Sequence, residues 1–258
     1  MLTRTATTDC STSSSRPGVA RSAPRAGARG AGPVLFLSPH PDDVAWSLGA
    51  TVSALAGARA ELHVLTLFGR SRYAPGHAVH GTLAASGVRA GEEARWAELA
   101  GVRLWRRDHP DATLRGFDDD TEMGQTPEPS LVERLRDDID AVIDAIEPRL
   151  VVAPLGVGSH VDHAAVREAA LRLRKQPSLA WYEDLPYAAM REPPAVARPI
   201  VVDVERRWPA KERGIRAFAS QRPDDVLPLV RAHAARVSGE RIWLERVAPD
   251  RWARISDA

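Results

Sequence analysis

Two short segments of the chain carry imidazoles and carboxylates at spacings that suit metal chemistry. Residues 38–43 read SPHPDD, and residues 155–163 read LGVGSHVDH. Imidazole nitrogens and carboxylate oxygens bind Zn²⁺ or Fe²⁺, and a site with three protein ligands leaves a position for water. Such a metal lowers the pKa of bound water to about 7 and polarises a carbonyl oxygen. The ionisable side chains of the two segments are His40, Asp42, Asp43, His160, Asp162 and His163.

The first segment supplies two metal ligands and a base. His40 and Asp43 lie three residues apart across a turn into a predicted helix, so both can face one ion. Asp42 then lies beside the metal without binding it and is placed to be the general base for the attacking water. The structural alternative is that Asp42 or Asp43 caps the helix that begins at Val44.

The second segment supplies the third ligand, and the residues themselves leave open which imidazole it is. His160 and His163 lie three residues apart near the start of a predicted helix. The imidazole that does not bind the metal would stabilise the oxyanion or protonate the leaving amine. Asp162, between them, would hold an imidazole in one tautomer and raise its basicity.

Both segments follow apolar runs that predict buried strands, residues 34–37 and 150–154. Further strands are predicted at 62–68, 102–105, 179–182, 200–202 and 239–247. Helices are predicted at 44–58, 89–101, 131–146, 160–173, 209–220 and 225–237. Strands that alternate with helices favour a parallel sheet with right-handed crossovers.

This alternation predicts an α/β fold with a three-layer, Rossmann-like, doubly wound and mostly parallel sheet in a single domain, residues 33–258. In such a sheet the carboxyl ends of all parallel strands share one edge. With the strand order 3-2-1-4-5, strands 34–37 and 150–154 are neighbours at the switch point, where ligands enter. Residues 38–43 and 155–163 should therefore meet, although more than a hundred residues separate them.

Composition narrows the class of partner. The 258 residues carry a formal net charge of +1, with 44% hydrophobic and 27% charged residues, which is typical of a globular protein that binds small molecules rather than nucleic acid. Cys10 is the only cysteine, which excludes thiolate metal sites. No apolar stretch approaches the ~20 residues that span a bilayer. Residues 1–32 lack a secretory apolar core and are predicted to be a disordered leader of a cytoplasmic protein without membrane partners.

The motifs resemble those of the PIG-L/LmbE-like family of metal-dependent N-deacetylases, which carry an H-P-D-D-E turn after the first strand and an H-x-D-H segment after a later one. The resemblance implies that the zinc ligands are His40, Asp43 and His163. It also implies that Asp42 is the general base and His160 the electrophilic or acid group. The expected reaction is zinc-dependent removal of an N-acyl group, foremost N-acetyl, from an amino sugar or sugar-bearing small metabolite, with Fe²⁺ as the alternative metal.

Weaker similarities extend over residues 34–221. Arg89 lies in an R-x-x-E helix and Asp111 follows the third predicted strand, and both are expected to contact substrate. Lys211 with Ser220-Gln221 resembles a K…SQ helix of the family. The chain departs from the family at Val44, where a Glu is usual. This departure motivates one rival function, hydrolysis of a non-sugar amide in natural-product metabolism. A second rival, from another class, is a catalytically idle metal-binding module on the same fold.

Overall fold

A seven-stranded sheet dominates the computed structural model of the chain, which describes residues 32–117, 124–193 and 199–246. In order across the sheet the strands are β3 (Arg103–Arg106), β2 (Leu62–Thr66), β1 (Val34–Ser38), β4 (Leu150–Pro154), β5 (Ser178–Tyr182), β7 (Glu240–Arg246) and β6 (Ile200–Val202). The strands β1 to β5 are parallel, and β7 runs antiparallel to both β5 and β6. The predicted order 3-2-1-4-5 is therefore correct.

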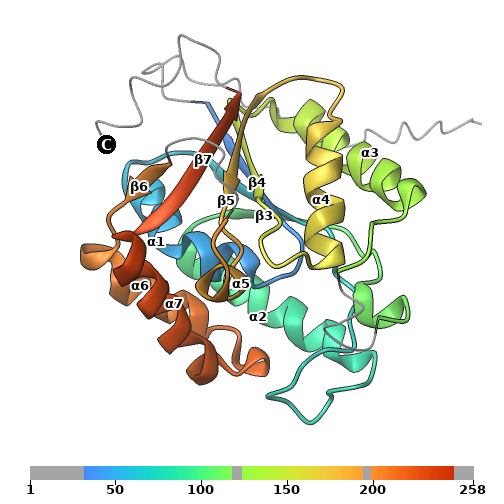
Figure 1. Cartoon of the computed structure of the whole chain (residues 1–258), viewed down its shortest axis with the longest axis horizontal. Helices are drawn as coiled ribbons and strands as arrows, with labels where there is room; N and C mark the ends of the chain where they lie inside the picture. The colour runs from blue at the N-terminus through green and yellow to red at the C-terminus, as the bar shows by residue number, and fades with distance from the viewer. Residues whose placement is uncertain (1–31, 118–123, 194–198, 247–258) are drawn as a thin grey trace, which may run out of the picture. The chain divides into compact units, whose positions relative to one another are not determined.

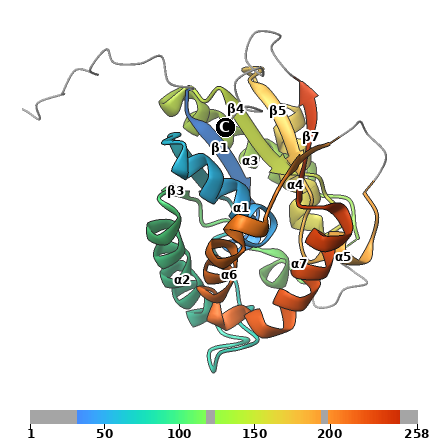
Figure 2. The ribbon, with the colours of Figure 1, turned by 90° about the vertical axis from the view of Figure 1, so that its left-hand side faces the viewer.

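Helices cover both faces of the sheet (Figure 1 and Figure 2). On one face lie α1 (Asp43–Gly57), α2 (Ala84–Ala100) and α6 (Trp208–Arg216). The opposite face carries α3 (Pro129–Ile146) and α4 (Val161–Leu171), which pack together. The helix α7 (Pro223–Val237) packs against α6 and the short α5 (Tyr187–Met190). The three-layer, mostly parallel α/β architecture is thus the predicted one.

The burial of the central strands explains their apolar sequences. Every residue of β1, β4 and β5 is buried, as expected for parallel strands covered by helices on both faces. The edge strand β3 is partly exposed. The helix α3 begins with Pro129 and buries an apolar stripe that includes Leu135 and Ile139, as its sequence period predicted.

The chain reverses its direction across the sheet between β1 and β4. The crossovers from β1 through β2 to β3 run one way, and that from β4 to β5 runs the other, while β1 and β4 pair directly, with Phe36 opposite Val152. This is the switch point of a doubly wound sheet, and the carboxyl ends of β1 and β4 meet there.

Several element boundaries differ from the predictions, and the largest difference is at the start of α2. The helix α2 begins at Ala84 rather than residue 89: Ala85 is buried, and the helix continues through Gly87 despite the low helix propensity of glycine. The strand β2 ends at Thr66 rather than 68, although the Leu67 and Phe68 N–H groups still donate to the carbonyls of Ser38, the last residue of β1, and Pro39. Residues 1–31 of the predicted leader lie outside the described residues, so the leader stays a prediction. No helix of the described residues is long and apolar enough to cross a membrane.

Candidate metal centre

The two predicted segments meet at the carboxyl edge of β1 and β4. One ligand atom from each of His40, Asp43 and His163 lies within 4.8 Å of the others. Asp43 is the first residue of α1, and its Oδ2 accepts a hydrogen bond from the His40 N–H at 2.7 Å. Its Oδ1 lies 3.5 Å from His163 Nε2. The turn after β1 and the start of α4 therefore bring together a His-Asp-His set with one common focus.

A further carboxylate, Asp184, orients the imidazole of His163. His163 Nδ1 donates to Asp184 Oδ1 at 2.6 Å, and both side chains are fully buried. Asp184 Oδ2 accepts from the N–H groups of Gly156 and Val157 at 2.8 and 3.0 Å. Asp184 thus holds a proton on Nδ1 of His163, and Nε2, which faces Asp43, is the nitrogen left to bind a metal. Within the described residues this buried Nε2 has no hydrogen-bond partner, which fits a metal ligand.

A second group, His40, His160 and Asp162, also lies within 4.8 Å. Asp162 is held by three protein donors, since it accepts from His40 Nε2 (2.9 Å), Ala112 N (2.9 Å) and Arg115 Nη1 (2.7 Å). The imidazole that the Asp162 side chain holds is that of the distant His40, rather than that of His160 or His163. His160 Nδ1 accepts from the Asp162 N–H at 3.2 Å, which places the proton of this imidazole on Nε2.

The pKa values of the clustered side chains favour a positive charge at the centre of the cluster. Burial by itself lowers the pKa of His40, but hydrogen bonds to Asp162 and Asp43 raise it to about 10. Burial raises the pKa of Asp43, and His163 and His40 outweigh it and lower that pKa to about 2. Without a metal, protons therefore occupy the imidazoles around an ionised carboxylate. A metal would take the place of such a proton.

His160 behaves oppositely to the two predicted ligand imidazoles. Burial and the positive charges of His163 and His40 lower the pKa of His160 to about 3. The imidazole of His160 is accordingly neutral at neutral pH and can donate a hydrogen bond through Nε2.

Asp42 lies beside the predicted ligands and forms an ion pair. Arg89 Nη2 donates to Asp42 Oδ1 at 2.8 Å, and Nη1 donates to Ser71 Oγ at 3.2 Å. Arg89 was predicted to contact substrate; its side chain lines the same cavity, and its described polar contacts go to protein groups. The substrate contact stays a prediction, and the structure adds that Arg89 orients Asp42.

The predicted ligands His40 and Asp43 line a cavity of about 300 Å³, together with Asp42 and His160. Its other walls include Trp46, Tyr73 and Tyr187, which are aromatic, together with Leu185. Asp111 also lines the cavity, and its Oδ1 accepts from Thr113 Oγ1 at 2.6 Å. Trp46, two residues after Val44, thus contributes to the wall of the site. A small molecule with flat apolar faces and polar edges fits this lining.

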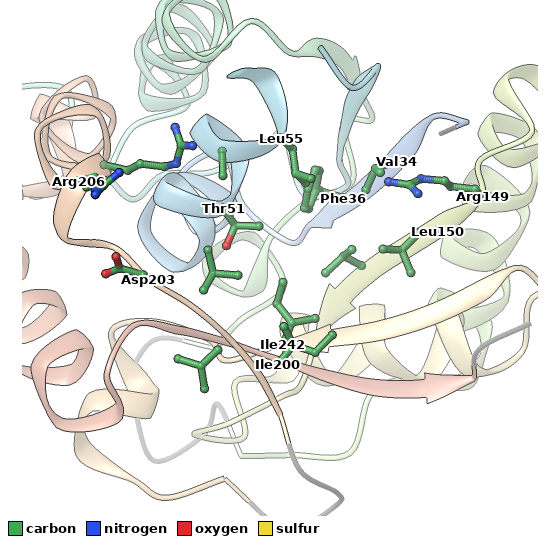
Figure 3. A pocket seen from close by; sticks show the side chains of 15 residues that line it. Val34, Phe36, Thr51, Leu55, Arg149, Leu150, Ile200, Asp203, Arg206 and Ile242 are labelled. Atoms are coloured by element: carbon green, nitrogen blue, oxygen red, sulfur yellow. The ribbon is translucent and has the colours of Figure 1, made fainter. Parts of the chain in front are cut away.

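A larger cavity, about 470 Å³, lies elsewhere on the sheet (Figure 3). It is bounded by α1, by the apolar side chains of Val34, Phe36, Leu150 and Ile242, and by arginines at its ends, including Arg206. No histidine is among the described residues that line it, so this cavity offers no imidazole to a metal centre.

Three residues around the centre have roles that the sequence did not predict. Asp184 comes two residues after β5 and so follows the rule that sites lie at carboxyl ends of strands, which would have indicated it. Arg115, which binds Asp162, had no local signal. Tyr187 packs its ring edge-on against His163 at 5.5 Å, with Gly158 close against its Cβ.

The fold and the site together define an α/β enzyme with a candidate metal centre at the switch point of its sheet. The family model described as "PIG-L: GlcNAc-PI de-N-acetylase" matches residues 35–173, which include both motif segments. The chain belongs to the PIG-L family and is a hydrolytic N-deacetylase.

Relatives support this membership over most of the chain. It is 34% identical over 240 residues to 2'-N-acetylparomamine deacetylase of Streptomyces fradiae, covering 86% of this chain and 81% of that protein. It is 27% identical over 221 residues to the probable N-acetyl-alpha-D-glucosaminyl L-malate deacetylase 2 of Bacillus anthracis, covering 83% and 92%. The crystal structure of a deacetylase from teicoplanin biosynthesis superimposes with a TM-score of 0.72 at 26% identity, covering 84% and 99%.

Proposed function

We propose that this chain is a zinc-dependent deacetylase that removes the N-acetyl group from an amino sugar of a small glycosylated metabolite of the aminoglycoside type. The observation that carries the proposal is the buried Nε2 of His163. Asp184 holds its proton on the opposite nitrogen, and it faces Asp43 at 3.5 Å. The 34% identity to a 2'-N-acetylparomamine deacetylase supports the substrate class.

The proposed zinc ligands are His40, Asp43 and His163. When bound, zinc would lower the pKa of a water molecule and polarise the amide carbonyl. Two imidazoles and one carboxylate also suit Fe²⁺, so metal analysis of the purified protein decides between the two ions.

The protein groups around the metal have distinct tasks in this proposal. Asp42, oriented by Arg89, accepts the proton of the attacking water. His160 donates from Nε2 to the oxygen that gains negative charge, because its Nδ1 already accepts from the Asp162 N–H. Asp42 takes one proton from the attacking water, and the departing amine needs one proton, so the reaction as a whole neither gains nor loses a proton.

The cavity walls favour a sugar over an extended apolar amide. Trp46, Tyr73 and Tyr187 offer aromatic surface on which the apolar face of a sugar ring can pack, while Asp111 offers a carboxylate to hydroxyl or ammonium groups. Asp111 and Arg89 are the proposed substrate-contacting residues.

The test is acetate release from a substrate panel by the metal-loaded protein. Mono-N-acetylated aminoglycosides, simple N-acetylglucosaminides and non-sugar acetamides are compared at equal concentration. We expect the highest kcat/KM for the aminoglycosides. A preference for non-sugar amides would refute the substrate class and leave the chemistry standing. No hydrolysis of any amide by protein that carries metal would refute the catalytic proposal itself.

A further inference from the structure

The helix α1 is interrupted shortly after the metal-binding turn. Leu48 has φ −125° and ψ 18°, outside the helical range, and the surrounding residues 43–52 are all buried. In an uninterrupted helix the N–H groups of Ala50 and Thr51 would donate to the carbonyls of Trp46 and Ser47. A buried backbone group without a partner is costly, so a break here requires other partners for these four groups.

One buried ion pair supplies all four partners. Lys211 Nζ donates to both carbonyls, at 2.7 Å and 3.3 Å. Glu240 accepts from both N–H groups, at 3.0 Å and 2.7 Å, and from the Thr51 hydroxyl at 2.6 Å. Lys211 Nζ and Glu240 Oε1 lie 2.5 Å apart. The ion pair is thus inserted where the two hydrogen bonds of a regular helix would lie.

Close packing of α6 on α1 lets Lys211 reach this position (Figure 2). A Cβ atom on Gly49 would lie 3.0 Å from Lys211 Cγ and 3.3 Å from its Cα, so the glycine makes room for α6. Lys211 is 1% exposed and Glu240 is 4% exposed. A lysine and a glutamate buried this deeply occur in proteins almost only when they are paired.

The helical segment before the break carries the metal-binding groups. It begins at Asp43, and the Trp46 N–H donates to the Asp42 carbonyl at 3.0 Å. Ser47 Oγ accepts from the Leu185 N–H at 3.1 Å, directly beside Asp184. The segment therefore contains the proposed carboxylate ligand, Asp43, and contacts the loop that orients His163.

We infer that Lys211 and Glu240 are positioning residues of the metal centre. By holding the break in α1, they set the direction of residues 43–47 so that Asp43 faces His163. The inference rests on the proposed metal centre of His40, Asp43 and His163. It gives the C-terminal part of the chain, α6 and β7, a role in a site whose ligands come from β1 and α4.

The test replaces both charges together, because removing one would leave the other buried and unpaired. The double variant is Lys211→Met/Glu240→Gln, and circular dichroism first checks that its metal-free form is folded. Its zinc affinity is then measured by competition with a chelator. We expect the affinity to fall at least about tenfold, a loss typical of groups that orient ligands. The control is Asp140→Asn/Arg174→Met, which removes an ion pair of 2.8 Å between α3 and the chain after α4, with a buried carboxylate and an exposed arginine. It should lower stability and leave zinc affinity unchanged.

The outcomes separate this inference from the proposed function. Unchanged zinc affinity in the folded double variant, or an equal loss in the control, overturns the positioning role. Failure of the wild-type protein to bind zinc overturns the metal centre, and the inference with it. If the double variant does not fold, Gly49→Ala tests the positioning role instead. This variant keeps both charges, and its added methyl group pushes Lys211 away from the break in α1. A measurable loss of zinc affinity supports the role, and wild-type affinity refutes it.

Discussion

Replacing Asp184 by Asn should switch the tautomer of His163. Asp184 Oδ2 accepts two backbone N–H groups, from Gly156 and Val157, and Oδ1 accepts from His163 Nδ1. Asn has one carbonyl oxygen, and the two backbone donors will take it. The amide NH₂ then donates to Nδ1 of His163, which moves the imidazole proton to Nε2 and removes the lone pair that faces Asp43.

The expected loss of zinc affinity is about 10- to 100-fold, the range found for partners that orient metal-binding histidines. At 1.36 kcal/mol per factor of ten this corresponds to about 1.4–2.7 kcal/mol. Zinc affinity is measured by competition with a chelator, and the thermal midpoint of the metal-free protein is measured in parallel. Asp184→Asn that binds zinc as tightly as wild type would refute the assigned tautomer.

Glu183→Gln is the matched control for this prediction. Glu183 precedes Asp184 at the same strand end, and its side chain is also buried. It accepts hydrogen bonds from His233 Nε2 and Trp243 Nε1, each at 2.9 Å. It touches no predicted ligand. Its substitution should lower stability and leave zinc affinity unchanged, which separates a local tautomer effect from general destabilisation.

Three further outcomes are expected. Asp42→Ala should lower kcat by about 10²–10⁴-fold while metal content, measured by elemental analysis, stays at the wild-type level; full activity would exclude Asp42 as the base. His163→Ala should abolish stoichiometric metal, whereas unchanged content would transfer the ligand role to His160. Burial raises the pKa of Glu93 to about 7 against its usual 4.5, although Thr66 and Arg106 oppose the shift. Its contribution to stability is therefore present below pH 4.5 and is lost as pH rises through 7, by up to about 3 kcal/mol. Glu93→Gln should flatten the fall in urea-unfolding free energy between pH 5 and 8, and an unchanged slope would contradict the raised pKa.

The sheet and the meeting of the two motifs could be predicted because both depend on local patterns. Apolar runs such as 34–37 and 150–154 indicate strands buried on both faces, and parallel topology places their carboxyl ends together. His40 and Asp43 needed no tertiary information to be paired, because a short turn links them. The boundary of α2 was less predictable, because Gly87 resembles a loop residue until its helix is packed.

What the sequence determined by itself was the identity of the chemical groups and the edge of the sheet where they gather. Only the tertiary structure decided how each group is held: Asp184 on His163, Asp162 on His40, Arg89 on Asp42, and the Lys211–Glu240 pair across the break in α1. The physical reason is that these contacts join residues 21 to 122 positions apart through single side-chain hydrogen bonds or ion pairs. No periodicity or spacing along the chain encodes such partners, since they arise when packed elements bring lone donors and acceptors into one buried space.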